Sequence, residues 1–259
     1  MKILAVETSG KTFSAALNED GKTLASFIYD CGHIHSEMLI PAMEKILKDT
    51  GNTHQSIDRF AVSTGPGSFT GIRVGMTAVK TMAQALNKPV VAIDALSILE
   101  KSFIDCFQQI CCGESSSCHP ARSRRVYKLI DSATSRRMTS DAAQFCCAEN
   151  RLVAAIDALR NEIYVKNKGA IVIKHIDDFI KENKKHKNKI IVIGNASSVY
   201  KEKLEKNLGK PSVCLPPDFN IPKAQVLALI AQYEKPKKYS EIEPLYIRRS
   251  WAEEKAENR

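Results

Sequence analysis

The chain has 259 residues, of which 44% are hydrophobic and 26% charged, and its formal net charge at pH 7 is +9. This composition is typical of a soluble globular protein, and the length is sufficient for two lobes that share a cleft. No apolar run approaches the ~20 residues that span a bilayer, and the apolar start is too short for a signal peptide. We therefore expect a cytoplasmic protein and exclude a membrane protein.

The first hundred residues predict one lobe. Short β-rich apolar runs and a turn at residues 18–21 indicate strands, and apolar residues at helical spacing indicate two helices. The expected elements are strands at 2–8, 13–17 and 22–29, a helix at 36–50, a strand at 59–63, a helix at 71–86 and a strand at 90–93. This order predicts a mixed sheet with covering helices, so we assign residues 1–100 to a first lobe.

Residues 101–150 differ in composition from the rest of the chain. They contain six of the eight cysteines, a run of three serines and five arginines in a chain that elsewhere prefers lysine. We predict an insertion of low order between two lobes. Disulfides are not expected in a cytosolic chain, and adjacent cysteine pairs chelate zinc poorly, so we predict no metal site here.

Residues 151–259 are assigned to a second lobe. The expected elements are strands at 152–157, 162–165 and 170–173, a helix at 177–182, a strand at 190–193, a helix at 198–207 and a last amphipathic helix that begins at Pro222. Each lobe opens with an apolar strand that ends in an acid, Glu7 in the first and Asp157 in the second.

The stretch STGPGSFTGIR, residues 63–73, forms a glycine-rich loop before a helix. Helix N-termini bind phosphate because their unpaired N–H groups point outward. The glycine spacing fits neither the dinucleotide fingerprint nor the P-loop. Two interpretations remain: the loop binds phosphate, or it only turns the chain into the helix, with Thr70 as the N-cap.

The helices at 36–50 and 71–86 carry broad apolar surfaces, and the second is apolar on more than one face. Gly71 and Gly75 would let a neighbouring helix approach closely. Either both helices are buried inside one subunit, or they form a patch that another subunit completes. For the second case the predicted interface residues are Met38, Leu39, Ala42, Met43, Ile46, Gly71, Val74, Gly75, Ala78 and Met82.

Other candidate sites are weaker. His33 and His35 could begin a metal site, but we favour a surface or capping role for this pair and predict no bound metal. No nucleophile elbow is present, and we assign no catalytic residue. The positive charge favours a polyanionic partner such as RNA, although much of the excess lies in residues 181–189, a run typical of a solvated helix end and loop.

Five segments together resemble the TsaB family, also called YeaZ. They are ILAVETS at 3–9, HSE at 35–37, STGPGSFTGIRVG at 63–75, DALRNEIY at 157–164 and PLYIRR at 244–249. The resemblance covers roughly residues 1–100 and 151–250. It implies an α/β chain with the two-lobed actin-like, sugar-kinase and Hsp70-like (ASKHA) ATPase fold, in which helices flank mixed sheets.

The resemblance also implies a function. TsaB-like proteins take part in forming N6-threonylcarbamoyladenosine at position 37, in the anticodon loop of tRNAs that read codons starting with A. The transferase is the paralogue TsaD, and the TsaB-like chain is a non-catalytic dimerisation platform that activates it, with TsaE as an ATPase. We therefore expect a heterodimer with TsaD, a possible homodimer of the isolated chain, and contact with tRNA only through the complex.

Two positions favour the non-catalytic branch. Asp94-Ala95-Leu96-Ser97 stands where TsaD-like chains place their metal-binding histidine pair, and Gly194 stands where the fold usually has a Gly-Gly adenosine-binding turn. We expect no cofactor beyond weak ATP or ADP binding. The residues that could retain phosphate or nucleotide contacts are Glu7, Thr8, Ser9, Gly65, Gly67 and Gly194. The alternatives are an independent ATP-dependent enzyme of the same fold and, less favoured, a metallopeptidase.

Overall fold

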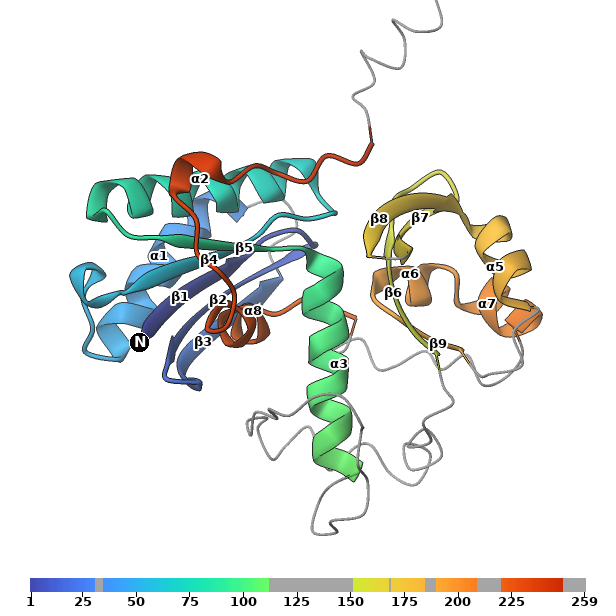
Figure 1. Cartoon of the computed structure of the whole chain (residues 1–259), viewed down its shortest axis with the longest axis horizontal. Helices are drawn as coiled ribbons and strands as arrows, with labels where there is room; N and C mark the ends of the chain where they lie inside the picture. The colour runs from blue at the N-terminus through green and yellow to red at the C-terminus, as the bar shows by residue number, and fades with distance from the viewer. Residues whose placement is uncertain (31–34, 112–150, 168, 185–189, 209–219, 249–259) are drawn as a thin grey trace, which may run out of the picture.

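The computed structural model describes residues 1–30, 35–111, 151–167, 169–184, 190–208 and 220–248. These residues form two lobes, each built on one sheet with helices against it (Figure 1). The predicted α/β architecture with two mixed sheets is confirmed. Among the described residues, no helix combines the length and apolar character that crossing a membrane requires.

The first lobe contains a five-stranded sheet in the order β3-β2-β1-β4-β5. Its strands are β1 (Lys2–Glu7), β2 (Thr12–Glu19), β3 (Lys22–Asp30), β4 (Arg59–Ser63) and β5 (Val90–Ile93). The strands β1, β2 and β3 form an antiparallel meander, whereas β4 and β5 run parallel to β1. A short 3-10 turn, η1 (His54–Ser56), precedes β4.

Helices cover both faces of this sheet. The helices α1 (His35–Asp49) and α2 (Phe69–Leu86) pack on the face that carries Leu4 and Val6. The helix α8 (Ala224–Ala231) packs on the opposite face, which carries Ile3 and Ala5. Successive residues of a strand point to opposite faces, so burial on both sides explains why β1 is continuously apolar.

Residues 224–242 pack on the first lobe, which differs from the assignment of residues 151–259 to the second. Ala224, Leu227 and Ala228 of α8 are fully buried against the first sheet. Beyond α8, Lys237 forms an antiparallel bridge with Val90 at the edge of that sheet. The apolar pattern of α8 predicts a buried helix, but it does not specify which sheet the helix covers.

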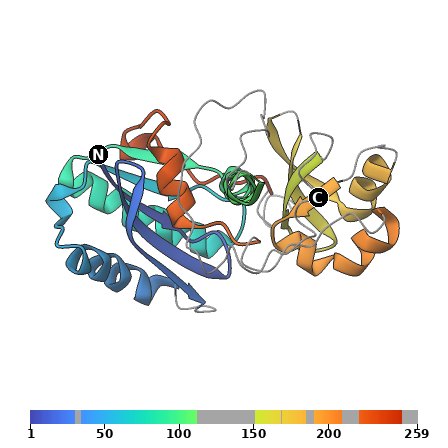
Figure 2. The ribbon, with the colours of Figure 1, turned by 90° about the horizontal axis from the view of Figure 1, so that it is seen from below.

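The helix α3 (Ala95–Cys111) lies between the lobes, and Figure 2 views it end-on. Ile98 packs into the first lobe with α8, whereas Leu99 and Phe103 pack against the second sheet. Residues 101–111, predicted as the start of a poorly ordered insertion, therefore continue this helix. Residues 112–150, including Cys112, Cys118, Cys146 and Cys147, lie outside the described residues.

The second lobe has a four-stranded sheet in the order β8-β7-β6-β9. Its strands are β6 (Arg151–Asp157), β7 (Glu162–Asn167), β8 (Ala170–His175) and β9 (Ile190–Ile193), and its helices are α5 (Ile176–Lys184), α6 (Asn195–Val199) and α7 (Lys201–Leu208). The helix predicted at 198–207 is thus two helices that meet at Tyr200. In the described part of this sheet, β6 and β9 pair in parallel, whereas β6–β7 and β7–β8 are antiparallel.

The helix α2 approaches the end of β1 so closely that two of its glycines have no space for a side chain. A Cβ atom on Gly71 would lie within 3.0 Å of the Thr8 carbonyl oxygen, and one on Gly75 within 3.0 Å of Thr8 Oγ1. These glycines therefore serve a contact inside the lobe. The predicted role of Gly71 and Gly75 in admitting a helix of another subunit is corrected accordingly.

Replacing Gly71 by alanine should destabilise the fold, because the new methyl group meets backbone that cannot rotate away. We expect Gly71→Ala to lower the free energy of unfolding by about 1–3 kcal/mol. The matched control is Gly10→Ala, where the nearest atom to the new Cβ lies at 3.7 Å. Urea unfolding followed by circular dichroism measures both variants; equal stability of the two would contradict the steric argument.

Candidate functional site

The glycine-rich loop packs directly on the residues that follow β1. A Cβ atom on Gly67 would lie within 3.0 Å of the Ser9 carbonyl oxygen, and the Ser68 N–H donates to that oxygen at 2.7 Å. Ser68 is the N-cap of α2, because its hydroxyl accepts a hydrogen bond from the Gly71 N–H at 3.2 Å. The predicted N-cap, Thr70, is wrong: it lies inside the first turn of the helix.

Glu7 is a buried acid at the end of β1, with 1% of its surface exposed. Its Oε1 accepts hydrogen bonds from the Ser9 N–H at 2.6 Å and the Ser9 hydroxyl at 2.5 Å. Burial raises the pKa of Glu7, and the nearby hydroxyls of Ser63 and Ser9 lower it in part. Ser63 is close enough to lower the pKa of Glu7, but it makes no hydrogen bond of ordinary geometry with Glu7 Oε2. Within the described part of the chain, neither Glu7 Oε2 nor Thr8 Oγ1 has a hydrogen-bond partner.

Asp157, the acid that ends β6 in the second lobe, is used within its own lobe. Its Oδ1 accepts from the Leu159 N–H at 3.0 Å and from the Tyr200 hydroxyl at 3.0 Å. Burial, together with the hydrogen bond to Asp157, raises the pKa of Tyr200 to about 12. The Tyr200 hydroxyl therefore stays protonated at neutral pH and holds the start of the β6–β7 turn.

Gly194, the sixth predicted phosphate or nucleotide contact, lies in the second lobe. Its φ of 98° favours glycine, and a Cβ atom there would lie within 3.0 Å of the Ala155 carbonyl oxygen. Its N–H donates to Asn220 Oδ1 at 3.0 Å, and its carbonyl accepts from the Ser197 hydroxyl at 2.7 Å. The turn thus packs on β6, and its polar groups are already paired within the chain.

The other five predicted contacts form one group in the first lobe. Gly67 packs on Ser9, and Thr8 packs on α2 just after the loop. Gly65 packs on Ile72 and accepts a hydrogen bond from the Ala95 N–H at 2.7 Å. The structure therefore brings Glu7, Thr8, Ser9, Gly65 and Gly67 together.

Asp94 precedes α3 and caps it. It stands where, by the resemblance, TsaD-like chains have their metal-binding histidine pair. Its Oδ1 accepts from the Ser97 N–H at 2.8 Å and its Oδ2 from the Ser97 hydroxyl at 2.6 Å. The Nζ atom of Lys166 on β7 lies 3.4 Å from Asp94 Oδ1 and 3.1 Å from Glu100 Oε2. Within the described ranges no group of three or more His, Cys, Asp or Glu residues could hold a metal ion. His33 and the side chain of His35 lie outside the described part.

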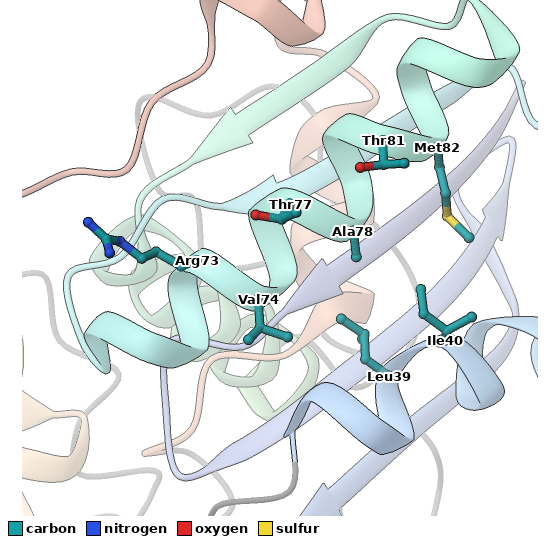
Figure 3. Close-up of a pocket in the computed structure, with 8 residues that line it drawn as sticks. All are labelled: Leu39, Ile40, Arg73, Val74, Thr77, Ala78, Thr81 and Met82. Atoms are coloured by element: carbon teal, nitrogen blue, oxygen red, sulfur yellow. The ribbon is translucent and has the colours of Figure 1, made fainter.

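A groove with a volume of 480 Å³ runs between α1 and α2 on the surface of the first lobe (Figure 3). In Figure 3 the side chains of Val74, Ala78 and Met82 on α2 are directed toward Leu39 and Ile40 on α1. The lining residues are Leu39, Ile40, Arg73, Val74, Thr77, Ala78, Thr81 and Met82. The floor is therefore apolar, and the exposed residues of α2 at its rim are polar or charged.

The interface predicted from the sequence is only partly at this surface. Leu39, Ala42, Met43 and Ile46 are at most 5% exposed and belong to the core of the first lobe, although Leu39 also reaches the groove. Because these four side chains are buried within the subunit, the prediction that they form an interface with another subunit is corrected. The four remaining residues, Met38, Val74, Ala78 and Met82, are half-buried against the core.

Sequence reasoning missed Ile40, which is 38% exposed and lines the groove. Ile40 lies beside the apolar stripe of α1 rather than within it. An apolar residue outside the buried stripe of an amphipathic helix is the signal that could have found it.

A known protein family matches the part of this chain that contains α1 and α2. Residues 30–110 match the family model described as TsaD: tRNA N6-adenosine threonylcarbamoyltransferase. The tRNA threonylcarbamoyladenosine biosynthesis protein TsaB of Bacillus subtilis (strain 168) is 36% identical over 99 residues, which are 38% of this chain and 43% of that protein. The matched part thus spans less than half of the Bacillus protein.

Two further comparisons extend over nearly the whole chain. The protein of the same name from Haemophilus influenzae is 26% identical over 271 residues, covering 96% of this chain and 94% of its own. The structure of YeaZ from Pseudomonas aeruginosa superposes with a TM-score of 0.60 at 21% identity, covering 95% of this chain and 99% of that one. These comparisons support the TsaB (YeaZ) family for this chain. The two-lobed fold implied by the resemblance to TsaB is thereby confirmed.

The buried Glu7 should make stability depend on pH in a defined direction. The raised pKa keeps Glu7 protonated in the folded chain at pH values where the unfolded chain, with an ordinary value of 4.5, has released the proton. The contribution of Glu7 to the free energy of unfolding therefore falls as the pH rises above 4.5. Glu7→Gln removes this dependence, so the stability of the variant relative to the unsubstituted protein should grow from acidic to neutral pH.

Urea unfolding at three pH values, about 4, 6 and 8, measures the effect against the ordinary carboxyl titration range. The control is Glu44→Gln, a substitution at an exposed position of α1. Its difference from the unsubstituted protein should stay constant over the series. A constant difference for Glu7→Gln as well would show that burial does not perturb this carboxyl.

Proposed function

We propose that the chain is a non-catalytic subunit that binds and activates a TsaD-type transferase in the formation of N6-threonylcarbamoyladenosine in tRNA. The names of the relatives and the family model at residues 30–110 support a role in this pathway. The observation that carries the activating role is the apolar groove between α1 and α2. It is an apolar surface on a helix pair that the described residues of one copy leave uncovered.

The groove has the form of a helix-docking surface. Val74, Ala78 and Met82 follow each other at intervals of four residues, which forms one ridge along α2. The small side chain of Ala78 stands in the middle of this ridge and allows the backbone of a partner helix to come close. A helix pair of the transferase seated on α1 and α2 would complete a four-helix interface. An interface of ordinary specific size buries ~1,200–2,000 Å², so the contact would extend beyond the groove.

The first lobe supports a non-catalytic chain because several of its polar groups serve the fold. Asp94 and Ser97 cap α3, and Ser68 uses both its N–H and its hydroxyl within the loop. Activation would then act through contacts that hold the transferase in its productive geometry. In this proposal the chain acts in the cytoplasm, meets tRNA only through the complex, and is joined there by a TsaE-type ATPase. When isolated, it pairs with a second copy through the same groove.

One observation favours the alternative of an ATP-dependent enzyme. Among the described residues, Glu7 Oε2 and Thr8 Oγ1 are buried without hydrogen-bond partners beside the glycine loop. A bound phosphate and its metal ion would provide partners for such groups. Against this, the amide of Gly194 and the carbonyl of Ser9 are already paired within the chain. We therefore propose weak nucleotide binding at most.

Calorimetric titration of the isolated chain with Mg-ATP separates the two functions. The activating role predicts no saturable binding below about 1 mM, equivalent to a binding free energy weaker than about −4 kcal/mol. Binding in the micromolar range that Thr8→Val abolishes would instead favour the ATP-dependent enzyme. Thr8→Val nearly keeps the volume of the side chain and replaces the hydroxyl by a methyl group.

A charge in the groove should prevent docking of the transferase. Ala78→Glu places a carboxylate in the centre of the apolar ridge, and glutamate is a good helix former, so α2 itself should remain folded. We expect the affinity for the TsaD-type transferase of the same organism to fall by about 30-fold or more, since a residue central to an interface typically contributes at least ~2 kcal/mol. Calorimetry or co-elution from a sizing column measures the affinity.

The matched control for this experiment is Ala170→Glu. Ala170 is exposed at the start of β8, in the other lobe, so the same substitution should leave the affinity unchanged. Circular dichroism shows whether both variants are folded. Equal affinity of a folded Ala78→Glu variant and the control would refute docking through the groove.

A further inference from the structure

The segment of residues 242–248, which we call the strap, runs along α2 from the first lobe toward the second (Figure 1). It follows η4 (Tyr239–Glu241). The Ile242 side chain is buried in the core of the first lobe, and its carbonyl accepts a hydrogen bond from Lys80 of α2 at 2.9 Å. Leu245 N–H donates to the Thr64 carbonyl at 2.9 Å. The beginning of the strap is thus attached to the first lobe at two points.

The middle of the strap is held by a stack on the first turns of α2. The guanidinium of Arg73 lies 3.9 Å above the centre of the Phe69 ring, and Arg73 Nε donates to the Tyr246 hydroxyl at 2.7 Å. The rings of Phe69 and Tyr246 are 5.3 Å apart between centres. Both rings are about half exposed, so the cation and its hydrogen bond, rather than the core, hold Tyr246 in place.

The end of the strap reaches the second lobe. Arg248 forms an ion pair and hydrogen bond with Glu162, the first residue of β7. Glu162 is itself tied into the β6–β7 turn, because its carbonyl accepts from the Ala158 N–H at 2.9 Å and its N–H donates to the Leu159 carbonyl at 3.0 Å. Three consecutive residues, 246–248, therefore reach from α2 to the sheet of the second lobe.

The strap and α3 contact both lobes at different places. The helix α3 forms an apolar connection between the lobes, because Ile98 packs in the first lobe and Leu99 packs against the sheet of the second. In Figure 1 the strap runs beside α2, whereas most of α3 extends away from the strap. A rotation of the lobes about α3 would change the distance between α2 and β7, and the pair of Arg248 and Glu162 restrains that distance. The strap therefore favours one angle between the lobes.

We propose that the strap couples occupancy of the α1–α2 groove to the angle between the two lobes. Arg73 connects the two, because it lines the groove and also holds Tyr246. A partner seated on the groove contacts Arg73 and so changes the position of the strap, which in turn restrains the second lobe. Because coupling is reciprocal, the lobe angle also changes affinity at the groove. The coupling rests on the proposed function, whereas the strap itself does not.

Reversing the charges of the ion pair tests the strap in the isolated chain. The variants are Arg248→Glu, Glu162→Arg and the double exchange, and neither residue lines the groove. Spin labels or fluorophores on unnatural amino acids at the exposed positions Glu44 of α1 and Glu205 of α7 report the distance between the lobes. Each single variant places like charges together and should broaden and lengthen the distance distribution. The double exchange restores the attraction and should restore the distribution.

Affinity for the TsaD-type transferase tests the coupling with the same proteins. Each single variant should bind about fivefold more weakly, a change at the low end of typical coupling between sites, and the double exchange should recover the affinity. Recovery separates an effect of the pair from a direct contact of Arg248 with the partner. The control is Lys206→Glu on α7, a charge reversal outside the strap, which should change neither measurement.

The two measurements fail independently. An unchanged distance distribution in both single variants overturns the strap, whatever the partner does. A changed distribution with unchanged affinity overturns the coupling. If the unsubstituted chain does not bind the transferase, the proposed function fails, and the distance measurement still decides whether residues 242–248 restrain the lobes.

Discussion

The close contact between the start of α2 and the end of β1 is the constraint on which the rest of the first lobe depends. Gly71 and Gly75 lie against Thr8, and Gly67 lies against Ser9, at distances that exclude any side chain. Because the glycine backbone meets the carbonyls of Thr8 and Ser9 and the buried Thr8 side chain there, α2 has one depth and one direction relative to the sheet. That direction places α2 beside α1 and forms the groove. It also places Phe69 and Arg73 where the strap can reach them.

The same contact explains why the glycine loop resembles a ligand site and yet serves the fold. A loop that must approach a strand end needs glycine, whether the strand end holds a phosphate or only the neighbouring backbone. Here Ser68 donates its N–H to Ser9 and caps α2 with its hydroxyl, so donors of the loop are used inside the lobe. A loop held in this way is a rigid support for a docking helix. Glu7 and Thr8, buried beneath it, are the groups that this internal pairing leaves incomplete.

Among the described residues, α3 and the strap both connect the lobes, and the two connections differ in strength. The contact through α3 has a buried apolar part, to which Lys166 adds ion pairs with Asp94 and Glu100, so α3 can serve as a packed axis for small rotations. The contact through the strap consists of a cation stacked on exposed rings and a partly exposed ion pair, which are weaker and depend on ionic strength. A chain with one strong and one weak connection between its lobes can change their angle at low cost.

The sequence by itself determined the types of the elements, their order and the family resemblance, because strands and helices differ in local apolar period. The tertiary structure alone decided which side of each apolar helix is covered. Leu39 and Met43 of α1 are buried by their own sheet, whereas Ile40 remains at the surface. An apolar stripe indicates that a face is covered, but the covering segment can lie anywhere in the chain. For the same reason only the fold shows that α8 covers the first sheet, that α3 continues to Cys111, and that Arg248 meets Glu162.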